Sequence, residues 1–316
     1  MDSGLGLSLP QLSLRPAPMH PLRSLALYLL AVFGLGALLA PWLFALAQWA
    51  GERLPLLAPL AGHPFHRYVH RSLLLVALVG LWPFLRSIQV RSWRDLGVVS
   101  PVGRGRDLAT GFAVGFASLA AVAALALAFG GRHLAPEPRW DRLFHAVLTA
   151  VAVAGMEEVL FRGALFGALR KVHHWLTALG VSSVVYALVH FFQRPPAPAR
   201  VSWSSGLEML PQMLKGFTEL PSLAPGFFVL TLAGAILAWA FHRTGDLWCA
   251  FGLHAGWVFW LKSYGAFTSA RPEACLPFWG SHKLVDGWLA GIVLAGVLGL
   301  LPRLLPWHGA PPGRTN

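Results

Sequence analysis

The sequence has 316 residues, of which 56% are apolar and only 12% are charged. Soluble domains carry roughly 25% charged residues, so this composition is typical of a helical protein with many membrane spans. The formal charge of +12 comes from bases in short polar gaps. There they can contact lipid headgroups, and no compact basic motif indicates nucleic-acid binding. The two cysteines, Cys249 and Cys275, exclude a disulfide framework and a CxxC metal site.

Long apolar runs predict an all-α fold, a polytopic transmembrane helix bundle with about eight spans. A polar segment at 1–21 precedes them, without a recognisable cleavable signal peptide. We divide the remainder into transmembrane helices with a basic connector at 22–140, a core at 141–265, a last transmembrane helix at 266–307 and a disordered tail at 308–316. The predicted spans lie near 22–50, 69–90, 108–130, 143–170, 174–193, 225–243, 246–264 and 284–306.

The polar features of the first 140 residues are interpreted as structural. His66 and His70 are expected in a loop before the second span, where a headgroup-facing segment is a better interpretation than a metal site. The connector 86–107 contains five arginines, can lie as an interfacial helix, and favours cytoplasmic termini. Gly111 and Gly115 form a pair of small residues that allows another helix to pack closely.

The fourth span carries charged residues in the stretch "AGMEEVLFRGAL". Unpaired, Glu157, Glu158 and Arg162 would together cost about 8–10 kcal/mol in the middle of a span. Glu158 and Arg162 are four residues apart and can form an ion pair on one helix face. Glu157 points about 100° away around the helix and has no local partner. This carboxylate must be protonated, meet a cation or metal ion from another span, or face water.

Two histidines on other spans are candidate partners for this carboxylate. His190 lies near the end of the fifth span, four residues after Tyr186, so both can face one side of a helix. His254 lies in the middle of the seventh span between Gly252 and Gly256, a second close-packing pair. The gap between these spans, 193–226, contains prolines that stop the fifth span, and its middle can form a short amphipathic segment.

Several kinds of chemistry fit Glu157, His190 and His254. A carboxylate can activate water for amide hydrolysis while nearby donors bind the developing oxyanion. The three side chains could instead ligate zinc, although we expect no cofactor. They could also relay protons in a transporter, but no inverted repeat or paired broken helices support that reading. The sequence contains neither an HExxH zinc helix nor a GxSxG nucleophile.

Three motifs in the same order resemble those of the CPBP intramembrane proteases, also called the ABI or CAAX-protease family. The first, EExxxR, runs from Glu157 to Arg162. The second, FxxxH, is similar to "YALVH", which ends at His190, and the third, HxxxN, begins at His254 in "LHAGWV". Their order and spacing match over 150–265, so the resemblance implies that 141–265 is the catalytic core of an intramembrane endopeptidase.

The resemblance also implies a role for each matching residue. Glu157 would be the general base that activates a water, and His190 would hold and polarise that water. His254 would bind the oxyanion of the tetrahedral intermediate. Glu158 and Arg162 would order the site.

Two positions depart from the family motifs. Tyr186 replaces the phenylalanine of the second motif, and Val258 occupies the asparagine position of the third. Valine donates no side-chain hydrogen bond, and losing one oxyanion donor lowers the rate by about 10²–10³-fold. Either Trp257 or Tyr264 supplies a replacement donor, or the chain is slow, or it is a non-catalytic relative.

The resemblance implies a protein or peptide substrate, membrane-anchored or lipidated, and no nucleic-acid partner. We expect an integral, multi-pass protein of the bacterial inner (cell) membrane. Two other functions remain open: a catalytically impaired scaffold or immunity protein, and a proton-coupled transporter.

Overall fold

The computed structural model describes residues 19–193, 195–218, 220–271, 275–281 and 284–305 and is almost entirely helical, as predicted. Most of the expected N-terminal segment 1–21 and all of the tail 308–316 lie outside the described residues. Two short strands, β1 (Arg132–Leu134) and β2 (Thr268–Ala270), pair antiparallel. The helices are α1 (Pro21–Arg53), α2 (Ala58–Ala61), α3 (Phe65–Ser87), α4 (Gly105–Ala128), α5 (Arg142–Glu157), α6 (Gly167–Val172), α7 (Trp175–Val189), α8 (Ser205–Met213), α9 (Leu220–Thr244), α10 (Trp248–Phe267), α11 (Leu276–Trp279) and α12 (Trp288–Leu304).

Each range predicted as a span contains a helix over most of its described residues. In the described part of the chain, five are long and apolar enough to cross a bilayer by length and composition: α1, α3, α4, the continuous helix Arg142–Val172 and Leu223–Thr244 of α9. The apolar helices α7 and α12 are shorter. The continuous helix includes α5, a π-helical segment at Glu158–Phe166, and α6. The protein is therefore an integral, multi-pass membrane protein.

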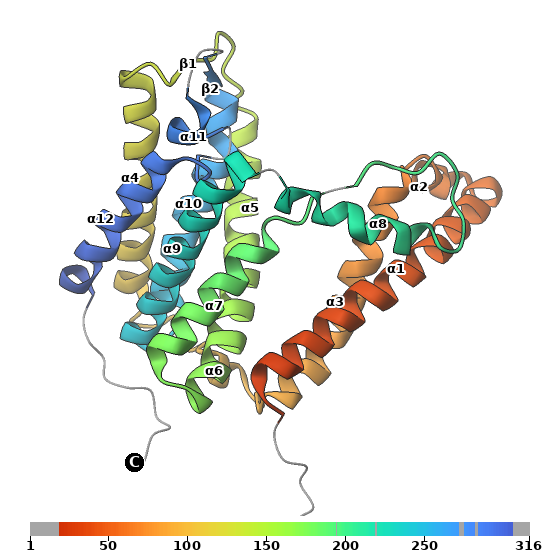
Figure 1. The fold of residues 1–316 in the computed structure, drawn as a ribbon, viewed down its shortest axis with the longest axis horizontal. Helices are drawn as coiled ribbons and strands as arrows, with labels where there is room; N and C mark the ends of the chain where they lie inside the picture. The colour runs from red at the N-terminus through yellow and green to blue at the C-terminus, as the bar shows by residue number, and fades with distance from the viewer. Residues whose placement is uncertain (1–18, 194, 219, 272–274, 282–283, 306–316) are drawn as a thin grey trace, which may run out of the picture.

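The molecule has two parts whose helix axes run in different directions. Figure 1 shows α4, α5, α7, α9, α10 and α12 side by side in one bundle, while α1 and α3 form a hairpin that slants away from it. The bundle has its own apolar core, and a second core joins α1, α3 and Met209 of α8. A third apolar cluster, from the end of α3 to Ala164 and Ala168, connects the hairpin to the bundle.

Glycines bring α4 and α10 into backbone contact, as the two small-residue pairs predicted. A Cβ on Gly115 would lie 2.1 Å from the carbonyl oxygen of Leu253, and one on Gly252 would lie 2.2 Å from that of Leu108. No larger residue fits at such distances without moving a helix. This packing places the middle of α10, with His254, in the interior of the bundle.

Two predictions about the connecting segments were wrong. His66 and His70 lie in the first two turns of α3, because the buried residues Phe65, Tyr68 and Val69 continue its apolar face to its start. The connector 86–107 is not an interfacial helix. It contains only a short turn at Trp93–Leu96 before α4, because several of its apolar side chains are buried in the third cluster. The amphipathic segment expected within 193–226 is present as α8.

Candidate active site

The candidate site residues come from three helical elements of the bundle. Glu157 is the last residue of α5, and Glu158 and Arg162 lie in the π-helical segment that continues it. His190 directly follows α7, and His254 lies near the middle of α10. A π-helix is wider than an α-helix and is often found at functional sites. The π-helical segment begins at Glu158, directly after Glu157.

The expected ion pair between Glu158 and Arg162 is present and buried. Arg162 Nη1 lies 2.9 Å from Glu158 Oε1, and the two side chains are 2% and 1% exposed. The guanidinium also lies 4.4 Å from the ring centroid of Tyr186 on α7, and its Nη2 lies 3.5 Å from the carbonyl oxygen of Gly234 on α9. Arg162 therefore connects three helices while neutralising the buried carboxylate of Glu158.

Glu158 also fixes the orientation of His254. Its Oε1 lies 2.7 Å from His254 Nδ1. A carboxylate paired with an arginine is an acceptor, so Nδ1 carries the proton and donates it to Glu158. In the neutral imidazole, Nε2 is then an acceptor. It lies 3.5 Å from the hydroxyl oxygen of Tyr186.

His190 is oriented in the same way by a backbone group. Its Nδ1 lies 2.7 Å from the carbonyl oxygen of Tyr186. A carbonyl oxygen can only accept, so Nδ1 is the donor and Nε2 of the neutral ring is an acceptor. His190 lies at the C-terminal end of α7, where carbonyl groups lack partners within the helix.

Both Nε2 atoms face the carboxylate of Glu157. Glu157 Oε2 lies 3.8 Å from His190 Nε2 and 3.8 Å from His254 Nε2. It makes no hydrogen bond with any residue that the structure describes. Three acceptor atoms that face one another repel unless hydrogens lie between them. The arrangement therefore suits a molecule that donates two hydrogen bonds, as water does.

Glu157, His190 and His254 lie at the wall of a cavity of about 810 Å³. The volume lies within the range of about 300–1,000 Å³ that is common for ligand pockets. Glu157, Tyr186, His190 and His254 contribute to its wall, and so does Val258. The remaining wall is largely apolar, with further polar side chains from Gln193, Lys262 and Asp286.

Sequence reasoning missed Lys262 and Gln193 as cavity residues. Lys262 lies eight residues after His254 on the same helix, a spacing that falls within one wide helical stripe, and it could have been found on that basis. Gln193 lies three residues after His190 in an irregular segment, and its backbone N–H donates to the carbonyl oxygen of Met213. No periodicity in the sequence indicates where such a residue points.

Trp257 and Tyr264 do not replace the asparagine that the family has at position 258. The indole Nε1 of Trp257 donates to Ser118 Oγ on α4 at 2.9 Å. The ring of Tyr264 lies under the guanidinium of Arg132, 4.6 Å from its centroid. Neither residue lines the cavity as the structure describes it. An oxyanion formed beside His254 would therefore need a different donor.

The fit of these residues to zinc can be tested on their arrangement. Within the described residues, no group of three or more His, Cys, Asp or Glu side chains is arranged to hold a metal ion. Glu158, the nearest further carboxylate, is already bound to Arg162 and His254. The residues therefore do not fit zinc as they stand.

Comparison with known proteins agrees with the motifs. Residues 138–260 match the family model described as "Type II CAAX prenyl endopeptidase Rce1-like". No curated protein and no solved structure matched the chain. The matched range includes all five candidate residues, the helices α5 and α7, and most of α10. Residues 138–260 are thus a domain of the CPBP family of CAAX-type membrane endopeptidases.

Proposed function

We propose that Glu157 is the general base in a metal-free hydrolysis of a peptide bond at or within the membrane. One observation supports this most directly. Glu157 Oε2 lies 3.8 Å from Nε2 of His190 and 3.8 Å from Nε2 of His254. All three are acceptors, and they line the wall of one cavity. A water that donates one hydrogen to the carboxylate and the other to an imidazole satisfies two of them and is oriented for attack.

The proposed reaction then follows from the positions of the protons. The water oxygen attacks the carbonyl carbon of the scissile bond while Glu157 takes one of its protons. A tetrahedral intermediate forms, with the negative charge on the former carbonyl oxygen. Glu157 next transfers the proton to the leaving nitrogen as the C–N bond breaks. The products are a new carboxylic acid and a free amine.

The oxyanion requires hydrogen-bond donors. Because Val258 provides none, we consider other side chains of the cavity. Tyr186, whose hydroxyl lies 3.5 Å from His254 Nε2, and Gln193 both carry donors and line the cavity. His254 would add a further donor at Nε2 in its imidazolium form. In this scheme Glu158 and Arg162 are positioning residues, because they act on the reaction through His254.

The family implies a protein or peptide substrate at the membrane. We further propose a substrate held to the bilayer by a membrane anchor or a covalent lipid, since the cavity lies within a membrane bundle. Residence in the inner membrane of a bacterium is likewise a proposal.

Replacing Glu157 by glutamine tests the proposal. We expect Glu157→Gln in the purified protein to slow peptide cleavage by about 10²–10⁴-fold, the usual contribution of a general base. Glu208→Gln is the matched control, because Glu208 lies on α8 away from the cavity. Unchanged cleavage by Glu157→Gln would exclude the proposed role.

The zinc alternative is tested on the same preparation with a chelator. Loss of cleavage that added zinc restores would favour metal-assisted hydrolysis over the metal-free scheme. Cleavage in water enriched in ¹⁸O tests whether the reaction is a hydrolysis at all, because either route places one solvent oxygen in the new carboxylate.

Val258 favours a second candidate, a non-catalytic scaffold or immunity protein. Its side chain lines the cavity one turn beyond His254, is 3% exposed and offers no donor. For this alternative, Glu157→Gln would leave the cellular phenotype unchanged, and the purified wild-type protein would cleave no peptide.

A further inference from the structure

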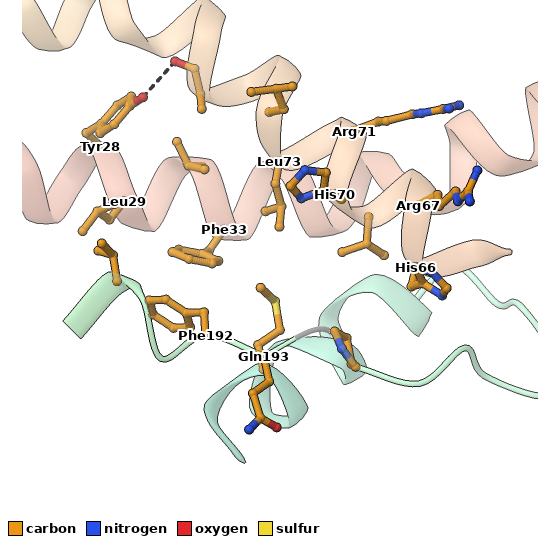
Figure 2. A pocket seen from close by; sticks show the side chains of 17 residues that line it. Tyr28, Leu29, Phe33, His66, Arg67, His70, Arg71, Leu73, Phe192 and Gln193 are labelled. Carbon is orange, nitrogen blue, oxygen red and sulfur yellow. Dashed lines mark hydrogen bonds between the residues drawn. The ribbon is translucent and has the colours of Figure 1, made fainter. Parts of the chain in front are cut away.

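A second cavity, of about 820 Å³, lies between the α1–α3 hairpin and the segment that follows α7. Figure 2 shows its apolar wall, in which Leu29 and Phe33 of α1 lie opposite Phe192. The rings of Phe33 and Phe192 are 5.1 Å apart. Leu73 and Leu74 of α3 extend this wall. An apolar space of this size within a membrane protein suits a hydrocarbon chain.

One end of the cavity is strongly basic. His66, Arg67, His70 and Arg71 all line it, from the first two turns of α3. The spacing of four residues places Arg67 and Arg71 along one face of the helix. Arg71 lies about 9 Å along the axis from the helix start at Phe65. Basic side chains near the end of a membrane helix can extend to the lipid headgroups.

In the part of the chain that the structure describes, no carboxylate neutralises Arg67 or Arg71. Among the described residues, neither Arg67 nor Arg71 forms an ion pair with Asp or Glu. Arg67 Nη1 donates to His63 Nδ1 at 3.2 Å, and the guanidinium of Arg71 lies 6.0 Å from the ring centroid of Tyr68. Burial and the charges of both arginines lower the pKa of His63. This end of the cavity is therefore electropositive and suits an anion.

We propose that this cavity binds an anionic phospholipid from the bilayer. Its phosphate lies between Arg67 and Arg71, and an acyl chain lies along the apolar wall toward Phe33 and Phe192. Arginine forms charge-assisted hydrogen bonds with phosphate oxygens, and basic pockets beside membrane helices commonly take lipid headgroups. Free phosphate would leave the apolar wall uncovered, and an uncharged hydrocarbon chain would leave the basic end unpartnered.

The lipid would also border the active site. Phe192 and Gln193 line both cavities, and both follow closely on His190. In Figure 2 the amide of Gln193 points away from the side chains of α1 and α3. The proposed lipid therefore shares a wall with the peptidase cavity without contacting Glu157 or His254.

Native mass spectrometry of the whole protein tests the headgroup contact. The probes are bilayers of phosphatidylcholine doped with phosphatidylglycerol, and phosphatidylcholine alone. We expect the wild type to retain one phosphatidylglycerol, and Arg67→Gln/Arg71→Gln to bind it about 30-fold less tightly, because each basic residue near an anionic surface contributes about fivefold. Arg86→Gln/Arg91→Gln is the control, with the same charge change at exposed positions outside the cavity.

A second pair of variants tests the acyl chain. Leu74→Trp narrows the cavity, whereas Leu78→Trp places the same ring one turn away at an exposed position outside it. We expect only Leu74→Trp to lower retention of phosphatidylglycerol. Because both leucines are exposed on α3, neither change depends on repacking a core.

Four results would overturn the proposal. The first is equal retention of the two phospholipids, and the second is an equal loss of phosphatidylglycerol binding in the arginine variant and its control. The third is competition by free glycerophosphoglycerol that is as strong as competition by the whole lipid. The last is displacement of phosphatidylglycerol by an uncharged fifteen-carbon isoprenoid alcohol. The last would assign the cavity to a substrate's hydrocarbon chain. None of these measurements requires peptide cleavage, so they are independent of the proposed reaction.

Discussion

Val258 lies one helical turn after His254 and presents methyl groups to the cavity wall. We expect Val258→Asn to raise kcat for peptide cleavage by about 10–100-fold, since one oxyanion donor changes rates by about 10²–10³-fold in well-placed sites. KM should change little, because the donor acts on the transition state. Val258→Ala, which opens space without adding a donor, is the control, and equal rates for the two variants would contradict this role.

Lys262 places a positive charge two turns beyond His254. The distance along α10 is about 12 Å, the length of three to four extended residues. We expect Lys262→Met to raise KM about fivefold for a peptide that ends in a free carboxylate a few residues after the scissile bond. The same peptide with a C-terminal amide should be unaffected. Lys171→Met, outside the cavity, should change neither value, and an equal effect on both peptides would contradict charge recognition.

At the scale of elements, the sequence indicated which residues meet but not how the chain is wound between them. Residues Glu158 and Arg162 form the predicted ion pair, yet they lie in a π-helical segment rather than an α-helix. Over nine residues an apolar run has no periodicity that distinguishes the two. The wider turn depends on tertiary contacts, such as the one from His254 to Glu158, which sequence spacing does not contain.

The α4–α10 contact gives a prediction about stability. A Cβ at Gly115 would lie 2.1 Å from the carbonyl oxygen of Leu253, whereas one at Gly296 of α12 would meet nothing within 4 Å. We expect Gly115→Ala to lower the melting temperature, with a loss of at least about 1–3 kcal/mol from overpacking against backbone.

Gly296→Ala is the matched control for that change. It should leave the melting temperature unchanged or raise it slightly, because alanine is favoured over glycine inside a helix by about 1 kcal/mol. Thermal unfolding of both variants in one detergent checks the pair. Equal destabilisation by the two substitutions would show that helix propensity, rather than the contact, determines the result.

At the scale of the molecule, hydropathy was sufficient to locate the helices but not to arrange them. A span is a local property of about 20 residues, so each predicted range overlaps a helix, although the ends differ by several residues. The slant of the α1–α3 hairpin depends on which side chains pack at its two ends, and so does the second cavity beneath it. For the same reason the sequence pointed to His190 and His254 as partners of Glu157 but gave no sign that Phe192 and Gln193 would separate two cavities.

The two apolar cores predict that the hairpin and the bundle open separately. Met209 of α8 is 1% exposed and packs into the hairpin core, which shares no residue with the bundle core. We expect Met209→Ala, a change that typically costs about 2–5 kcal/mol, to speed amide hydrogen exchange in α1, α3 and α8 while α9 and α10 stay protected. Met156→Ala, at a position that is 51% exposed, should leave both parts unchanged. Exchange that rises equally in α9 and α10 would mean that the third cluster, around Ala164 and Ala168, couples the two parts into one cooperative unit.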